Sequence, residues 1–211
     1  MQIKLKKALI WAFSAIFFIC LWYFAGFLVN STLILPLPHQ VFGKLLSLLF
    51  TKSFYAAMGA CFGRCVCAFL FSACLSFVLG FLMGLSPGAD IFFKFPLALI
   101  KATPAVTFVL LALFWFNSGN VPVFVAFLMT LPILTQAAAA GVGQCDEKLK
   151  QMCRVFGFSP VQKCLYLYFP SILGQFAPAL ISSFELTWKV VLAGEILSLP
   201  KNSVGAALYR A

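Results

Sequence analysis

Residues 143–170, which read GQCDEKLKQMCRVFGFSPVQKCLYLYFP, form a polar island in an otherwise apolar chain. The island gathers six charged residues: Asp146, Glu147, Lys148, Lys150, Arg154 and Lys163. The chain of 211 residues is 63% hydrophobic and only 9% charged, whereas about a quarter of the residues of a soluble domain are charged. Because so few polar side chains cannot cover a globule in water, most of this chain must be surrounded by lipid.

The first half of the island has the pattern of a short amphipathic helix. Its apolar residues recur at helical spacing and predict one apolar face: Leu149, Met152, Cys153 and Phe156. An apolar face in a water-exposed loop needs a cover, either membrane headgroups or a partner protein.

The second half of the island predicts a corner and a second helix. Gly157 is expected to end the first helix, and Ser159 can cap the second with Pro160 in its first position. Pro170 is expected to close this second helix and to open the next apolar stretch.

Outward from the island, five apolar stretches are long enough to cross a bilayer. They cover Ala8–Val29, Arg64–Leu85, Pro96–Phe116, Val121–Gly141 and Ser171–Leu199. Three lysines precede the first stretch and predict a cytoplasmic N-terminus: Lys4, Lys6 and Lys7. That stretch is too long for a signal peptide and lacks a cleavage site, so we expect it to be a retained anchor.

The apolar stretches divide the chain into three regions. Residues 1–30 form the cytoplasmic end and first span, residues 31–63 form an outer segment with a surface helix, and residues 64–211 form the membrane core. In the core, Gly80 and Gly84 have the spacing that allows two helices to approach closely, although the pair can also be coincidental.

Neither ATP chemistry nor metal chemistry has a motif in this chain. The sequence contains no phosphate-binding Gly-x-x-x-x-Gly-Lys-Ser/Thr loop. The eight cysteines include one tight pair, Cys65 and Cys67, with no His or acid nearby, so we interpret them as small hydrophobic side chains.

The last apolar stretch carries charges. Glu185 and Lys189 are spaced as a helical ion pair, and they either contact a solute or gate, or neutralise each other at a helix interface. Glu195 is expected to be a solvated cap near the outer end.

The spacing within the island resembles the "EAA" loop of ABC importer permeases. In that loop Glu-Ala-Ala is followed by three residues, a glycine, nine residues and a segment that ends in proline. Here the corresponding order is Gln151-Met152-Cys153, Gly157 and Leu167–Pro170, so the spacing, the glycine and the proline match. The Glu-Ala-Ala residues do not match.

Further residues are similar to the nitrate, sulfonate and taurine branch of these permeases. They are Leu35–Pro38, Arg64, Gly80, Gly84, Ala102–Ala105, Leu113–Phe116, Trp188 and Glu195. Members of this branch usually carry one more span after the region of Glu195. We therefore expect a truncated form of the family core, and the alternative is that the last helix of the family is dispensable here.

The resemblance implies an all-α membrane protein with the type I ABC importer permease fold, about five transmembrane helices and a cytoplasmic helix-corner-helix coupling loop. The loop residues expected to couple to an ATPase are Gln151, Met152, Cys153, Phe156, Gly157 and Pro170. The residues expected at a pathway or gate are Glu185, Trp188 and Lys189.

The resemblance also implies partners. We expect a second permease copy, cytoplasmic ABC ATPase subunits that hold ATP and Mg, and a periplasmic or lipid-anchored solute-binding protein, all at the inner membrane. The chain itself is expected to be no enzyme and to hold no cofactor. Its solute is expected to be a small oxyanion, a sulfonate such as taurine, or a thiamine-precursor pyrimidine. The alternatives are a secondary transporter or channel subunit, and a non-transporting scaffold derived from a truncated permease.

Overall fold

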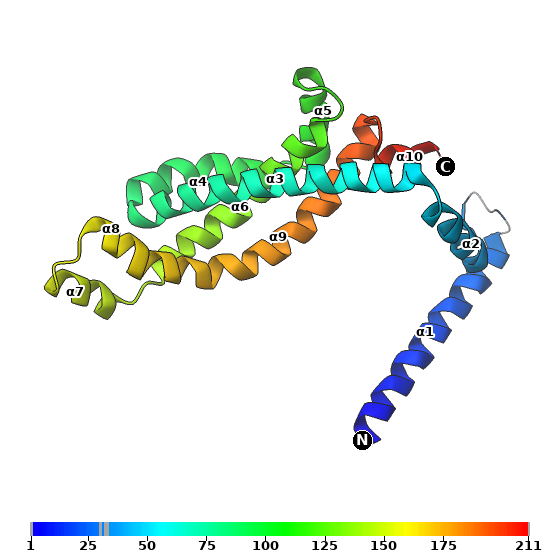
Figure 1. Ribbon diagram of the computed structural model, residues 1–211, viewed down its shortest axis with the longest axis horizontal. Coiled ribbons are helices and arrows are strands. Elements are labelled where there is room, and N and C mark those ends of the chain that lie inside the picture. Colours follow the sequence, from blue (N-terminus) through cyan, green and yellow to red (C-terminus); the bar gives the residue numbers. More distant parts are fainter. Residues whose placement is uncertain (1, 30, 32–33, 211) are drawn as a thin grey trace. The chain divides into compact units, whose positions relative to one another are not determined.

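The computed structural model of the chain describes residues 2–29, 31 and 34–210, and the described elements are all helical (Figure 1). In chain order they are α1 (Gln2–Val29), α2 (Pro38–Leu49), α3 (Lys52–Leu85), α4 (Pro87–Ala102), α5 (Ala105–Trp115), α6 (Val121–Gly143), α7 (Glu147–Val155), α8 (Pro160–Lys163), the π-helical turn η1 (Cys164–Tyr168), α9 (Phe169–Ser198) and α10 (Val204–Arg210). The expected all-α fold is confirmed.

The chain folds as two units, residues 1–55 and residues 56–211. In the first unit, two side-chain contacts hold the end of α1 to the start of α2 and to the segment before it. The Trp22 indole donates a hydrogen bond of 3.1 Å to the Pro36 carbonyl, and the Tyr23 hydroxyl lies 3.2 Å from Nδ1 of His39. The described apolar side chains of α1 are almost all exposed, as expected for a helix whose neighbour is lipid.

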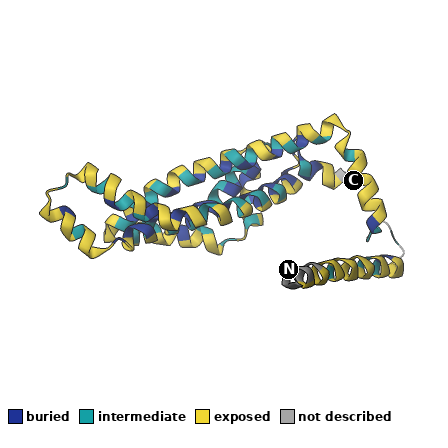
Figure 2. Cartoon of the chain, turned by 60° about the horizontal axis from the view of Figure 1, so that its bottom comes forward, coloured by how far each residue is buried: buried dark blue, intermediate teal, exposed yellow. Residues whose placement is uncertain are grey.

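In the second unit, α6 and α9 form the central helix pair, and the buried residues lie along the inner faces of the helices (Figure 2). Gly141 of α6 lets the backbone of α9 approach closely, because a Cβ atom there would lie only 2.5 Å from Cα of Ile172. Farther along, the hydroxyls of Thr130 and Thr187 share a buried hydrogen bond of 2.9 Å. This packing makes α6 and α9 the rigid centre of the bundle.

The helix α3 packs closely against α6 through its glycines. A Cβ atom at Gly80 would lie 2.5 Å from the carbonyl oxygen of Thr135, and one at Gly84 would collide with the side chain of Val142. One turn earlier, the Ser76 hydroxyl donates a hydrogen bond of 2.9 Å to a carbonyl of α6. The glycine pair is therefore a packing device and not a coincidence.

Within the residues that the structure describes, four helical segments are long and apolar enough to cross a membrane: Leu9–Val29, Lys52–Leu85, Val121–Gly143 and Pro160–Ser198. A fifth crossing is reached if α4 and α5, which meet at an angle of 99°, count as one broken span. The expectation of about five spans is therefore consistent with this structure, which is that of a multi-pass membrane protein.

Three expected spans have wrong boundaries. The fifth, expected from Ser171, belongs to a segment that begins at Pro160. The second begins at Lys52 rather than at Arg64, so Arg64 lies inside α3. The third is not one straight helix, because α4 ends at Ala102 and α5 starts after Pro104. Proline disfavours helical geometry in the residue before it, and Thr103 is accordingly extended, with φ −85° and ψ 129°.

Candidate functional site

The polar island lies at one end of the second unit, where α7 and α8 project beyond the ends of α6 and α9 (Figure 1). Asp146 caps α7 by accepting a hydrogen bond of 2.8 Å from the Lys148 amide. One turn of α7 is closed by a surface ion pair of 2.7 Å between Glu147 and Lys150. This hydrogen bond to Glu147 raises the pKa of Lys150, which is therefore a stable cation.

Gly157 forms the corner between the two loop helices. Its φ of +65° is a conformation that side chains other than glycine rarely adopt. The Phe158 amide bonds back to the Cys153 carbonyl at 3.0 Å and the Gly157 amide to the Arg154 carbonyl at 3.2 Å, which is the Schellman pattern of a helix end. The predicted glycine corner is confirmed.

The second loop helix starts with a capping box. The Ser159 hydroxyl accepts a hydrogen bond of 3.3 Å from the Gln162 amide, and the Gln162 side chain accepts one of 2.8 Å from the Ser159 amide. Pro160 occupies the first turn, where its missing N–H costs nothing. The predicted start of this helix is therefore confirmed.

The expectation that Pro170 closes the second helix is wrong. The helix continues through η1 into α9, so Pro160–Ser198 forms one long segment. A proline inside a regular α-helix collides with the carbonyl four residues earlier. Here the wider π turn, in which the Phe169 amide bonds to the Cys164 carbonyl, lies directly before Pro170 and relieves this conflict.

The loop has a small core of its own. Cys145, Cys153 and Leu167 are buried together, with Phe158 and Tyr168 packed against them. Burial raises the pKa of the Cys145 thiol, which Lys150 lowers only in part, so this thiol stays protonated and unreactive at neutral pH. The core holds α7 against η1.

This core changes the role of one predicted coupling residue. Cys153 is only 3% exposed and packs inside the loop, so it stabilises the loop and does not reach a partner's groove. Met152 is partly exposed and lines a hollow of about 370 Å³ between α7 and η1. Gln151 and Phe156 are exposed.

Sequence reasoning missed two apolar residues on the loop surface, Val155 and Val161. They are 83% and 66% exposed, and Phe156 beside the corner is 70% exposed. Val155 lies off the predicted apolar stripe, and Val161 lies in the second loop helix, so no single helical stripe contains all three side chains.

The charges of α9 fall into two environments. Glu185 and Lys189 are exposed, and neither belongs to an ion pair within the part of the chain that the structure describes. Trp188 is partly buried, with its ring 6.4 Å from that of Phe62. A pair that neutralises itself within one chain is therefore not observed.

Glu195, expected to be a solvated cap, is instead fully buried. One carboxylate oxygen lies 2.6 Å from a guanidinium nitrogen of Arg64, and the other accepts a hydrogen bond of 3.1 Å from the Gly205 amide. The other guanidinium nitrogen of Arg64 donates to the Lys201 carbonyl at 3.3 Å. The ion pair thus joins α3, α9 and the start of α10. The sequence analysis missed this ion pair. The signal that could have predicted it is one isolated charge in each of two apolar stretches, because charges inside membrane segments tend to pair.

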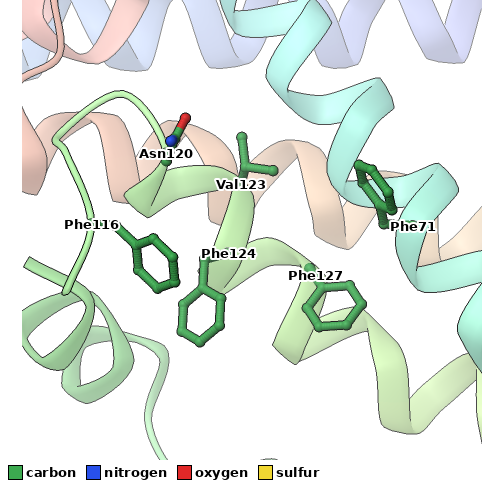
Figure 3. Close-up of a pocket in the computed structure, with 6 residues that line it drawn as sticks. All are labelled: Phe71, Phe116, Asn120, Val123, Phe124 and Phe127. Atoms are coloured by element: carbon green, nitrogen blue, oxygen red, sulfur yellow. The ribbon is translucent and has the colours of Figure 1, made fainter.

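A separate pocket of about 300 Å³ lies between α3, α6 and the turn before α6 (Figure 3). Its lining consists of Phe71, Phe116, Asn120, Val123, Phe124 and Phe127. It contains no titratable side chain, so its surface suits an apolar occupant and offers no acid–base chemistry.

No family model matches this chain. The chain is 23% identical over 187 residues to the taurine transport system permease protein TauC of Escherichia coli (strain K12). This match covers 86% of the chain and 68% of the relative. The similarity therefore concerns most of the helical bundle and not a single motif.

Proposed function

We propose that this chain, a homologue of ABC importer permeases of the sulfonate and taurine type, is the transmembrane subunit of an ATP-driven importer at the inner membrane. Residues 144–170 form the surface on which a cytoplasmic ATPase docks. The imported solute is a small oxyanion, a sulfonate such as taurine, or a thiamine-precursor pyrimidine.

The observation that carries this proposal is the exposed tip of the loop. Val155, Phe156 and Val161 expose apolar side chains at the end of α7 and in α8, the two helices that project beyond the ends of α6 and α9 (Figure 1). Lys148 and Arg154 of α7 are exposed as well. Exposed apolar side chains beside exposed cations suit a protein groove, which buries the apolar groups and leaves the charges at the rim.

The continuous helix gives the docked loop a mechanical connection to the membrane. Because α8, η1 and α9 are joined without a break, a displacement of the loop moves α9. The tight packing of α9 against α6 at Gly141 then passes the movement to the centre of the bundle. Such rigid-element motion between two discrete states is how packed helices switch.

The remaining partners complete the transport cycle. A second copy of the chain encloses the pathway, and a solute-binding protein delivers the solute from the outer side. ATP and Mg belong to the ATPase, which supplies the free energy, so this chain carries out no chemical step. Glu185, Trp188 and Lys189 lie on or near the face of α9 that turns toward the second copy, beside the pathway that the two copies enclose.

Substitution of the corner glycine tests the docking proposal. Gly157→Val places a branched side chain at φ +65°, which costs about 1–2 kcal/mol in the corner conformation. We expect about a tenfold loss of affinity for a candidate ABC ATPase partner that binds the wild type, measured by co-purification across ATPase concentrations.

Gly143→Val is the matched control. A Cβ atom at either glycine meets nothing within 4 Å, but only Gly157 has a positive φ. The control is expected to retain the ATPase. Equal retention of the ATPase by both variants, with unchanged solute uptake, would show that this corner is not part of a docking site.

A further inference from the structure

The exposed charges of α9 point to a partner outside the chain. Glu185 and Lys189 lie one turn apart in the middle of the helix, and both are exposed. Within the described residues, neither comes within 4.0 Å of an opposite charge. Charged side chains at membrane depth are costly unless they face water or meet an opposite charge.

The same face of α9 carries a mixture of small and larger residues beside the two charges. The small ones are Gly174, Ser182 and Ala193, and the larger exposed ones are Gln175, Pro178, Ile181 and Ile196. A Cβ atom at Gly174 would meet nothing within 4 Å, so this face is open. The Ser182 hydroxyl already donates to the Ala179 carbonyl at 3.1 Å, which leaves the two charges as the polar groups in need of a partner.

We infer that this face is the contact between two copies of the chain, in which Glu185 of each copy pairs with Lys189 of the other. This inference rests on the proposed function, because that function requires two permease subunits. In a twofold dimer whose axis runs along the membrane normal, the two α9 helices run in the same direction. The one-turn offset between Glu185 and Lys189 then suits a reciprocal diagonal pair, as in parallel coiled coils.

The small residues of the face, Gly174, Ser182 and Ala193, suit such a contact. Small residues let two helix backbones approach closely in a membrane, where lipid is as apolar as leucine and packing decides association. A second copy presents a lysine to Glu185 of the first copy and a glutamate to its Lys189. The face is therefore complementary to itself, as a twofold interface must be.

Two single charge reversals distinguish a pair between copies from a pair within one copy. Glu185→Lys gives a chain with two lysines at this face, and Lys189→Glu gives a chain with two glutamates. Each variant repels its own kind, but the two variants attract each other across the interface. Within each single chain, the two charges remain alike in every combination.

The experiment co-expresses full-length chains with two different affinity tags and measures the fraction of one that co-purifies with the other. We expect the mixture of Glu185→Lys with Lys189→Glu to associate at least about fivefold more than either variant with itself. Lys94→Glu, an exposed reversal on α4, is the control and is expected to associate like the wild type.

A second measurement does not depend on charge. Copies with Glu185→Cys and copies with Lys189→Cys are expected to form an oxidant-induced disulfide between them in membranes. Copies with Leu173→Cys, which is exposed on another side of α9, are not expected to do so.

Each outcome bears on the inference. Equal association of the mixed and unmixed variants, or a monomeric wild type, would overturn it. Intact ATPase binding together with equal association would reject this interface and leave the proposed function standing. A wild-type chain that forms the dimer but does not bind the ATPase would reject the proposed function and leave this interface standing.

Discussion

Glu195 shows how much one residue can organise in this bundle. Its carboxylate is fully buried, and it holds the guanidinium of Arg64 on one side and the backbone of Gly205 on the other. A buried charge is tolerated only when its partners satisfy it, and removal of one partner leaves the other uncompensated. The pair therefore anchors the start of α10 to the bundle.

Glu195→Gln is expected to lower the stability of the bundle. The substitution keeps the volume but removes the negative charge opposite Arg64, at a cost of up to about 3 kcal/mol, because Arg64 is partly exposed to solvent. The melting temperature in detergent measures the effect. Glu147→Gln removes the carboxylate of an exposed pair and is expected to change stability by less than about 1 kcal/mol. Similar melting temperatures for the two variants would contradict this assignment.

At the scale of elements, α3 contains two glycines in opposite environments. Gly80 is buried where α3 touches α6, and a Cβ atom there would lie 2.5 Å from a backbone oxygen. Gly59 lies in the same helix with nothing within 4 Å of its Cβ position. Alanine substitutions at these two positions therefore separate the effect of helix packing on stability from the effect of helix propensity.

Gly80→Ala is expected to destabilise the protein by about 1–3 kcal/mol, because α3 must move away from α6. Gly59→Ala is expected to be neutral or to stabilise the protein by up to about 1 kcal/mol, because alanine favours the helix. Thermal unfolding of both variants in the same detergent tests the opposite signs. A stabilising effect at Gly80 would mean that the two helices do not approach this closely.

The breaks in helices were harder to predict than the helices themselves. Pro104 separates α4 from α5, whereas Pro132 and Pro178 lie inside continuous helices, and Pro170 follows a π turn. A proline removes one donor in every case, but neighbouring helices and wider turns decide whether the chain bends. The sequence shows the prolines but not these neighbours.

At the scale of the whole molecule, the orientation in the membrane gives a direct test. If the loop of residues 144–170 is cytoplasmic, the turn between α5 and α6 lies on the outer side, because α6 joins the two. Ser118→Cys in that turn is expected to react with a membrane-impermeant maleimide in intact cells. Val155→Cys at the loop tip is expected to react only after permeabilisation, and the wild type reports the background from native cysteines. The reverse pattern would invert the orientation.

The sequence by itself determined that the protein lies in a membrane, that it is helical, and that residues 147–163 form two helices around a glycine corner. These features depend on composition, helical spacing and local capping, all of which act within a few residues. The tertiary structure alone decided that Cys153 is internal and that Glu195 is buried against Arg64. It also decided that Glu185 and Lys189 remain exposed without partners in the described chain. Burial and ion pairing depend on which helices become neighbours, and that choice joins residues that are far apart in the sequence.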